Sequence, residues 1–568
     1  MIFNNYLIGI IEDNTWVFYL SYLIKGLRGC TSYVGYPTGS CISINEPFSQ
    51  FSAYFITRIF SPVFGYNLII LGGFALNFFF AFWFFKKLFK PFTALLLSTV
   101  FFVSPYFAYQ SRSHIDLLQF WPVVWFLGTL FFSKSRYKGV YLGLLLALIT
   151  SFSNYLGYFT ILFTFLYLVF GFLLDKSKIH SFKKYYSSVL VGAAVFVLIS
   201  MTFLWPYIKS NYLVPRVPIG DKTVAKVVNK PLEDFVIFSS RPWYYLMPSV
   251  DNPFFGGTSQ GFLTKISSGG NYLTANYFKS EHSASFLGWV NMCLAVAGLI
   301  SLAVSFKTRR DSESRSPISY LVLSLSIIGL VILSMPPYVS VSGISFYTPS
   351  FLLFKAFPMF RVLARLGVLI LFLMLIFTGY GYELILRSAG SRRSTRFLSY
   401  ILIIFLVVFS LAESFITIKI TNVSASPKVY TYIGDTVLQK SPIVVYPYSK
   451  TTDAVFWIST YKQPLINPRF YEDTKTGFIA EDFTKNLNTT NGLNKAREMG
   501  AKYMVYFYEE DGNSAAGVFN GYPYFTKVEQ FTENSPDEQQ TKLGNYVLAK
   551  ISDLGSGRSN SAILYSFK

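Results

Sequence analysis

The sequence predicts a polytopic α-helical membrane protein that ends in a C-terminal α/β domain. The chain has 568 residues, 52% of them hydrophobic and only 14% charged, and its mean hydropathy is +0.41. A soluble protein carries about 25% charged residues. Apolar runs recur at about the 20-residue length that lets a helix cross a bilayer. No such run follows residue 420, so the last part of the chain is predicted to fold outside the membrane.

Ten apolar segments between residues 62 and 418 are predicted to cross the membrane. Their expected bounds are 62–85, 91–109, 117–133, 138–154, 156–174, 187–207, 285–306, 317–335, 363–387 and 397–418. Two shorter segments, 13–25 and 47–60, precede them and are interrupted by Lys25, Gln50 and Arg58. Short aromatic segments of this kind favour helices that lie in the plane of the membrane surface. A short tilted span is the alternative, and it would contradict the loop charges.

The positions of Lys and Arg predict which side of the membrane each loop occupies. Basic clusters follow the odd-numbered segments, at 86–90, 134–138, 175–184, 307–315 and 387–396. Cytoplasmic loops carry an excess of Lys and Arg. Residues 1–61, the loop 208–284 and residues 419–568 are therefore expected to lie outside, together with both chain ends. Because nothing in the chain would translocate such an N-terminus, we also expect the chain to lack a first membrane helix.

The chain is strongly basic, with a formal net charge of +20. The basic loops explain this charge, and the sequence holds no basic patch with a nucleic-acid-binding motif. Membrane lipids, rather than nucleic acid, are therefore the expected partners.

Residues 419–568 are expected to form a small extracytoplasmic α/β domain. Short β-branched runs at Ile443–Tyr446 and Tyr503–Tyr508 are typical of strands. A helical stretch that ends at Gly500 directly precedes the second run. The order helix, glycine, strand indicates an αβ unit.

Three cysteines are present, and none has the spacing of a zinc or thioredoxin site. Cys30 and Cys41 both lie in the first outer loop, whereas Cys293 lies in a predicted span. A disulfide between Cys30 and Cys41 is possible in an oxidising compartment, and two unpaired thiols are the alternative.

Two adjacent carboxylates, Glu12 and Asp13, stand before an aromatic run in the first outer loop. A carboxylate beside the bilayer could act as a general base, or it could bind a divalent cation that holds a phosphate. Asp13 is the stronger candidate for this role. The alternative is that Asp13 serves only as the N-cap of a helix.

Two further groups of polar residues are candidates for binding a phosphate or a metal. Arg112, His114 and Asp116 occupy the short outer loop between the second and third spans. The arginine can pair with phosphate, and His114 or Asp116 could join a metal site or a proton relay. Arg361 and Arg365 enter the ninth span from the outside, four residues apart on one predicted helical face. They could hold a pyrophosphate or extend to lipid headgroups.

Several short motifs are distributed over nearly the whole chain. They are Asp13, Tyr36-Pro37-Thr38-Gly39, Gly65-Tyr66-Asn67-Leu68, Ser104-Pro105-Tyr106, His114, Trp121-Pro122, Phe286-Leu287-Gly288-Trp289, Pro358 to Arg365, Glu413 and Tyr446-Pro447. In these motifs the sequence resembles the YfhO-like bacterial membrane proteins and related members of the GT-C glycosyltransferase superfamily.

The resemblance implies an inverting transfer of a sugar from a polyprenyl-phosphate donor to a cell-surface acceptor, on the outer side of the membrane. It also implies a catalytic acidic residue in the first outer loop, which by position is Asp13. Members of the family usually have glycine directly before this aspartate, whereas this chain has Glu12. Whether Glu12 shares the catalytic role is therefore open. Arg112, Arg361 and Arg365 are then candidates for stabilising the leaving phosphate.

A non-catalytic membrane protein is the alternative function, as a transporter or scaffold for lipid-linked sugars or cell-envelope polymers. A transporter would carry charged residues deep in its spans. Few are present here, Glu413 being the plainest, and this favours the enzyme.

Overall fold

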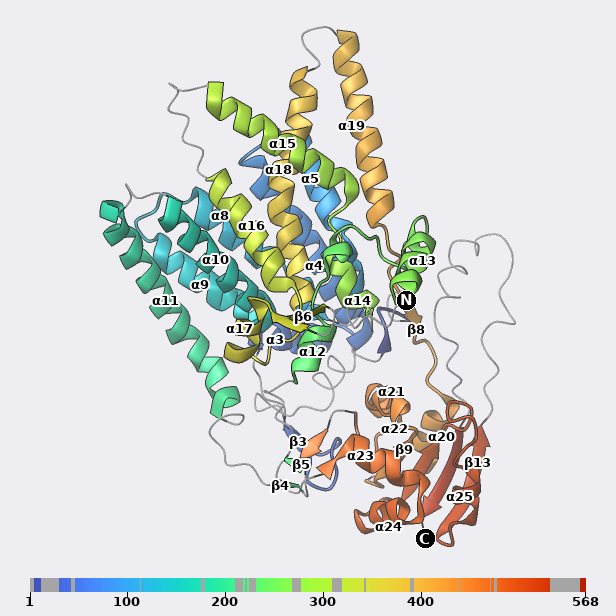
Figure 1. Ribbon diagram of the computed structural model, residues 1–568. Coiled ribbons are helices and arrows are strands. Elements are labelled where there is room, and N and C mark those ends of the chain that lie inside the picture. The colour runs from blue at the N-terminus through green and yellow to red at the C-terminus, as the bar shows by residue number, and fades with distance from the viewer. Residues whose placement is uncertain are drawn as a thin grey trace.

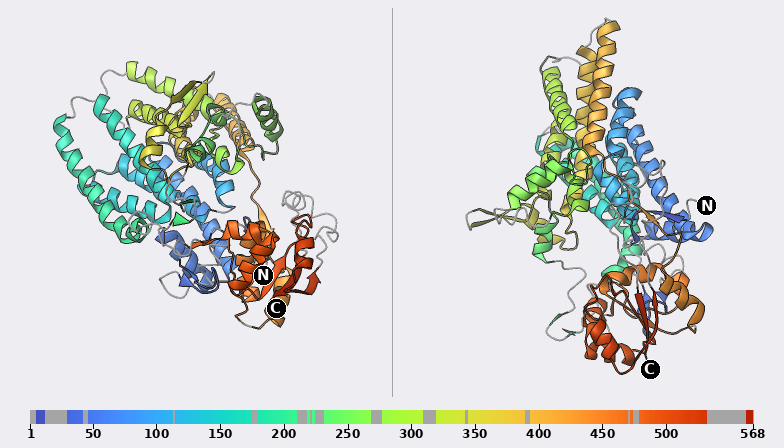
Figure 2. Two further views of the ribbon diagram at one scale, coloured as in Figure 1. Left: turned by 60° about the horizontal axis from the view of Figure 1, so that its bottom comes forward. Right: turned by 90° about the vertical axis from the view of Figure 1, so that its right-hand side faces the viewer.

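The computed structural model describes most of the chain. The described residues are 5–11, 30–41, 46–112, 114–174, 179–209, 218–219, 222–223, 231–267, 277–308, 319–341, 344–388, 393–438, 440–469, 471–473, 478–531 and 562–567. They form a bundle of long helices and a smaller part that contains a β-sheet, and this smaller part lies beyond one end of the bundle (Figure 1). The right-hand view of Figure 2 shows the same separation from the side. The predicted fold class is confirmed.

Every predicted span coincides with helix. The helices are α4 (Pro62–Lys86), α5 (Pro91–Phe102), α6 (Pro105–Gln110), α7 (Ile115–Leu118), α8 (Trp121–Phe132), α9 (Lys138–Phe152), α10 (Asn154–Leu174), α11 (Ile179–Ile208), α15 (Trp289–Thr308), α16 (Tyr320–Ser334), α18 (Gly367–Ser388) and α19 (Arg393–Ser414). In the described part of the chain, seven helical segments are long and apolar enough to cross a membrane, and α5, α9 and α16 are shorter apolar helices. The chain is a multi-pass membrane protein.

Proline shortens the second predicted span. The expected helix over 91–109 is two helices, because α5 ends at Phe102 and α6 begins at Pro105. Proline has no amide hydrogen for a helical hydrogen bond, and it disfavours helical backbone in the residue before it. The break leaves α6 and α7 as short helices that carry the polar loop of Arg112, His114 and Asp116 to one end of the bundle.

The central helix of the bundle is α18, which is buried along nearly its whole length. Glycine lets α15 and α18 approach closely, since a Cβ atom on Gly298 would lie 2.1 Å from the Phe377 carbonyl oxygen. A Cβ atom on Gly381 would lie 2.3 Å from the Leu294 carbonyl oxygen. Small residues of this kind are typical of packed membrane helices.

The basic ends of helices α18 and α19 lie at one end of the molecule, and the sheet lies at the other (Figure 1). The C-terminal end of α18 and the N-terminal end of α19 are far from the sheet in Figure 1. These ends carry Arg387 and Arg393, part of the last predicted cytoplasmic cluster. The arrangement fits the predicted orientation, in which basic loops and the C-terminal region occupy opposite sides. Which end faces the cytoplasm stays a prediction from loop charge.

The C-terminal region that begins at residue 419 is here called the tail. It contains a four-stranded sheet with strand order β13-β14-β12-β9. The strands are β9 (Ile443–Tyr446), β12 (Tyr503–Tyr506), β13 (Phe525–Phe531) and β14 (Ala562–Phe567), and only β9 and β12 are parallel. Its helices are α20 (Lys428–Thr436), α21 (Thr451–Phe456), α22 (Ile458–Tyr461), α23 (Ala480–Lys485), α24 (Thr490–Glu498) and α25 (Ala516–Gly521). The predicted αβ unit is confirmed: α24 is followed by Gly500, at φ +87°, and then by β12.

The chain before the first membrane helix contacts the tail at two places. Strand β1 (Tyr6–Ile8) pairs antiparallel with β8 (Ile420–Asn422), the first strand of the tail after α19. Val34 forms a parallel bridge to Leu465, and Leu465 forms another to Ile443 of β9. Residues around Val34 therefore extend the tail sheet beyond β9, although sequence analysis treated the two regions separately.

Of the two predicted surface helices, one is described. Helix α3 (Pro47–Ile59) matches the expected 47–60 and packs on α4 and α9. Its exposed side chains include Phe48, Phe55 and Ile59. The other predicted helix, 13–25, lies outside the described residues.

Candidate functional site

The candidate site lies at the end of the bundle that faces the tail (Figure 1). The start of α3, the start of α10, the loop between α6 and α7, the short helix α14 (Lys279–His282) and the 3-10 turn η6 (Leu363–Leu366) come together there. The chain supplies these elements from positions more than 300 residues apart, so the site exists only in the folded protein.

A buried ion pair joins two of these elements. Arg365 on η6 donates from Nε to Glu281 Oε2 over 2.6 Å and from Nη2 to Glu281 Oε1 over 2.7 Å. Both side chains are about nine-tenths buried, at 8% and 10% exposed. The guanidinium carbon also lies 5.0 Å from the ring centre of Tyr155 on α10. Two parallel charged hydrogen bonds and a ring face fix the plane and direction of this arginine.

Two carboxylates lie close together at the start of α10. Ser153 Oγ donates to Asp116 Oδ2 over 3.4 Å, and the next residue, Asn154, donates its backbone N–H to Glu46 Oε1 over 2.8 Å. Burial and the neighbouring Asp116 carboxylate raise the pKa of Glu46 well above its usual range, against the opposing effects of the Asn154 amide and Arg365. Like charges at short range cannot both ionise freely.

Sequence analysis missed Glu46. The only signal was its place directly before Pro47, a proline at the first turn of α3, which suggests nothing more than a helix start. Glu46 makes no side-chain hydrogen bond to its own helix. Its carboxylate instead caps α10, a helix that begins more than 100 residues later.

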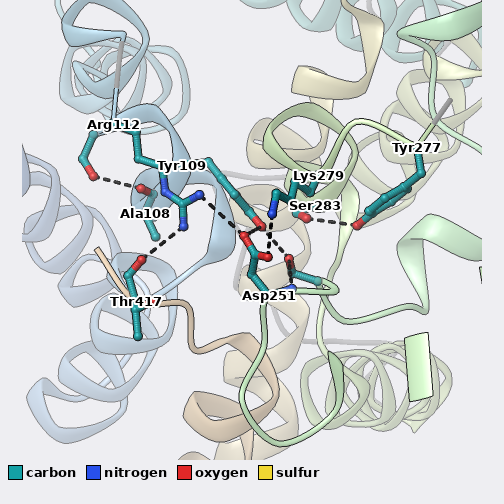
Figure 3. A network of polar contacts seen from close by, with 10 residues as sticks. Ala108, Tyr109, Arg112, Asp251, Tyr277, Lys279, Ser283 and Thr417 are labelled. Atoms are coloured by element: carbon teal, nitrogen blue, oxygen red, sulfur yellow. Dashed lines mark hydrogen bonds and ion pairs between the residues drawn. The ribbon is translucent and has the colours of Figure 1, made fainter. Parts of the chain in front are cut away.

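Arg112 has protein partners in a polar network shown in Figure 3. Its Nη1 lies 3.5 Å from Asp251 Oδ2, and its Nη2 donates to the Thr417 carbonyl over 3.2 Å. Asp251 also accepts from Lys279 Nζ over 2.9 Å and from the Tyr109 hydroxyl over 2.8 Å. Burial alone would raise the pKa of Asp251, but the hydrogen bonds from Lys279 and Tyr109 outweigh it and lower that pKa. This network ties α6, the loop that carries Asp251, helix α14 and the segment that follows α19 together.

Arg361 and Arg365 do not share a helical face, and the prediction that they would was wrong. Arg361 precedes η6 and pairs with Asp234 on α12 (Leu232–Ile237), above the Phe238 ring. The segment departs from α-helix because the Ala364 N–H donates to the Phe238 carbonyl over 3.0 Å rather than along its own chain. The two arginines therefore have different partners.

His114 lies near the Arg365 pair, within electrostatic range of Glu281. Asp13 and Glu12 lie outside the described residues. Among the residues that are described, no group of three or more His, Cys, Asp or Glu side chains could hold a metal ion. Asp116 and Glu46 do offer carboxylate oxygens, the ligand type that Mg²⁺ prefers, so a divalent cation here would need a further ligand.

Glu413, the plainest charge within the predicted spans, caps a helix. Its carboxylate accepts from the backbone N–H groups of Trp289, over 3.0 Å, and Val290, over 3.3 Å, at the start of α15. Gly288 has φ +85°, and a Cβ atom there would lie 2.7 Å from Glu413 Oε1. Two motifs far apart in the sequence thus meet in one helix cap.

Several solved structures of membrane enzymes are similar to this chain to different degrees. The arabinofuranosyltransferase AftD from Mycobacteria matches with a TM-score of 0.55 and 12% identity, over 99% of this chain and 40% of AftD. An oligosaccharyltransferase from Archaeoglobus fulgidus matches with a TM-score of 0.48 and 11% identity, over 92% of this chain and 70% of that chain. ArnT from Cupriavidus metallidurans matches with a TM-score of 0.41 and 10% identity, over 99% and 94%.

The chain shares the fold of AftD over 99% of its own length, and it spans 40% of the length of AftD. No family model matches the sequence, and no curated protein matches it.

Proposed function

We propose that this chain is a GT-C-type glycosyltransferase. It moves a sugar from a polyprenyl-phosphate donor to a cell-surface acceptor, with inversion, on the outer side of the membrane. The observation that carries the proposal is the meeting of the Asp116 and Glu46 carboxylates with the guanidinium of Arg365 at one end of the bundle. A transferase of this kind needs a base for the acceptor hydroxyl and positive charge beside the leaving phosphate.

The proposed roles follow from charge and position. Asp13, with Glu12 beside it, is the proposed base, and Arg365 is the proposed phosphate ligand. His114 and Asp116 are proposed to position the donor, and a divalent cation shared by Asp13 and Asp116 is compatible with oxygen ligands. Arg112 and Arg361 are proposed as further phosphate ligands, and each already pairs with a carboxylate, that of Asp251 and that of Asp234 respectively.

The proposal also covers the orientation of the chain in the membrane and the family to which it belongs. Both ends of the chain are proposed to be extracytoplasmic, on the charge of the loops. The narrower kinship with YfhO-like proteins is proposed on the short motifs alone.

Transfer by the purified full-length chain tests the proposal. The protein, reconstituted in lipid nanodiscs, is supplied with radiolabelled polyprenyl-phosphate sugars and with cell-envelope acceptors, with and without a chelator. We expect transfer by the wild type, a loss of about 10²-fold or more for Asp13→Asn, which is the range of a general base, and a smaller loss for Asp116→Asn, which is proposed to position the donor. Glu481→Gln, at an exposed ion pair with Lys485 on the tail, is the matched control and should remain active. Movement of intact donor across liposomes without transfer would instead favour the transporter.

A further inference from the structure

We infer that Glu281 is a positioning residue that holds Arg365 so that its Nη1 edge meets the donor phosphate. The inference rests on the proposed function and assigns a role to a residue that does not itself touch the donor.

The guanidinium of Arg365 is engaged on one edge. Nε and Nη2 both donate to the Glu281 carboxylate, and the Tyr155 ring covers a face. Within the described part of the chain, no hydrogen bond engages Nη1. A guanidinium can bind one carboxylate and still present donors to a second anion, because its five N–H groups point outward in one plane.

Glu281 is itself held from several sides. On the same short helix, His282 Nδ1 accepts from the Phe278 N–H over 3.0 Å, and His282 Nε2 lies 2.9 Å from the Ile237 carbonyl oxygen. Lys279 is paired with Asp251. Helix α14 therefore has anchors on both sides of Glu281, and the orientation of the carboxylate is set before any donor arrives.

The 3-10 turn η5 (Ser283–Ser285), which directly follows helix α14, packs on η6 and on the start of α18. Ser285 Oγ donates to the Ala364 carbonyl over 3.4 Å. A Cβ atom on Gly367 would lie 2.2 Å from the Ala284 carbonyl oxygen, so the two backbones nearly touch. Pre-organised donors bind an anion more tightly because less freedom is lost when it arrives.

A carboxylate that served only as a counterion would have the opposite effect. Replacing Glu281 by an uncharged group adds one unit of positive charge at the site, which attracts an anion more strongly. Loss of positioning weakens anion binding, whereas loss of a mere counterion strengthens it. The sign of the change in affinity therefore separates the two accounts.

The experiment measures binding of undecaprenyl phosphate, as the probe, to the full-length chain in nanodiscs, alongside the KM and kcat for sugar transfer. We expect Glu281→Gln to bind about tenfold more weakly, the effect of about 1.4 kcal/mol, with a raised KM and a smaller change in kcat. Glu281→Asp keeps the charge but shortens the side chain, and should lie between the wild type and Glu281→Gln. Glu481→Gln should match the wild type.

The outcomes are distinguishable. A wild-type chain that binds no undecaprenyl phosphate refutes the proposed function together with this inference. A wild type that binds, with a Glu281→Gln variant that binds equally or more tightly, refutes the positioning role alone. If Glu281→Gln fails to insert into the membrane, Glu281→Asp decides: affinity equal to that of the wild type overturns the inference, and weaker affinity supports it.

Discussion

The contact between the first outer loop and the tail can be tested by removing one hydroxyl group. Tyr471 follows Leu465 in the tail, and its hydroxyl lies 2.8 Å from Thr38 Oγ1 and donates to the Gly39 carbonyl over 2.9 Å. Gly35 has φ +74°, and a Cβ atom there would lie 2.4 Å from the Tyr471 ring. Tyr471→Phe keeps the ring in place and removes both hydrogen bonds.

The size of the effect follows from these two bonds. The hydrogen bond to Thr38 is exposed, so the lower part of the usual range applies, about 0.5–1 kcal/mol net for each bond. Tyr471→Phe should therefore weaken the contact by about 1–2 kcal/mol. A loss of this size raises the open fraction of the contact about 5- to 30-fold. Gly35→Ala should weaken it further, because it adds left-handed backbone strain of about 1–2 kcal/mol to the steric conflict with the ring.

Cysteine labelling measures the fraction of molecules in which the contact between the first outer loop and the tail is open. Val34 is 5% exposed and forms the bridge to Leu465, so a cysteine introduced there reacts only when the contact opens. With the three natural cysteines replaced by serine, the labelling rate of Val34→Cys should rise about 5- to 30-fold in the Tyr471→Phe background. Tyr524→Phe, at an exposed position elsewhere in the tail, is the control and should leave the rate unchanged. An equal rate with and without the Tyr471 hydroxyl would show that these bonds do not hold the loop.

Four further expectations concern chemistry, stability and topology. Asp13→Asn should lower sugar transfer by about 10²–10⁴-fold with normal membrane insertion, since asparagine keeps an N-cap but not the base; activity within about threefold of wild type would favour the N-cap. The folded state binds the proton of Glu46 more tightly than the unfolded state, so the stability that Glu46 contributes should fall as pH rises above its ordinary pKa of 4.5 toward the raised value. Thermal unfolding of Glu46→Gln should depend less on pH over that window, and an unchanged profile would contradict the assignment. The backbone of the β2–β3 hairpin (Cys30–Thr31, Ser40–Cys41) sets Cys30 opposite Cys41, a register that a disulfide can bridge; peptide mapping without reductant should find 30 linked to 41, and separate free thiols would exclude the bond. Cysteines placed at 176–184 should resist an impermeant reagent in sealed cells, whereas cysteines in the tail should react, and the reverse pattern would invert the topology.

Periodicity and composition were enough to predict the membrane bundle. A helix that crosses a bilayer must be apolar over about 20 residues. Each span is therefore visible as a continuous apolar stretch of sequence, whatever it packs against. The break between α5 and α6 was not predicted, although its cause, Pro105, is local. The αβ unit at Gly500 had an equally local cause, the left-handed residue that ends α24.

The site was only partly predictable. Asp116 and Arg365 were proposed as site residues because a short outer loop and the outer end of the ninth span place them at the membrane surface. Glu46 was not assigned, because it acts through a partner more than 100 residues away. Arg112 looked like a phosphate ligand in sequence, and Asp251, 139 positions later, is its partner in the folded chain.

The sequence by itself determined that the chain is a membrane bundle with an α/β tail, because hydrophobic burial and backbone hydrogen bonding act residue by residue along the chain. The pairing of charges depended on tertiary structure, because a buried ion pair is specified by the position of its partner in space and not by its neighbours in sequence. The same holds for the first outer loop: Val34 lies at the edge of the tail sheet because the backbone groups on either side of it pair with those of Leu465, a contact between residues more than 400 positions apart.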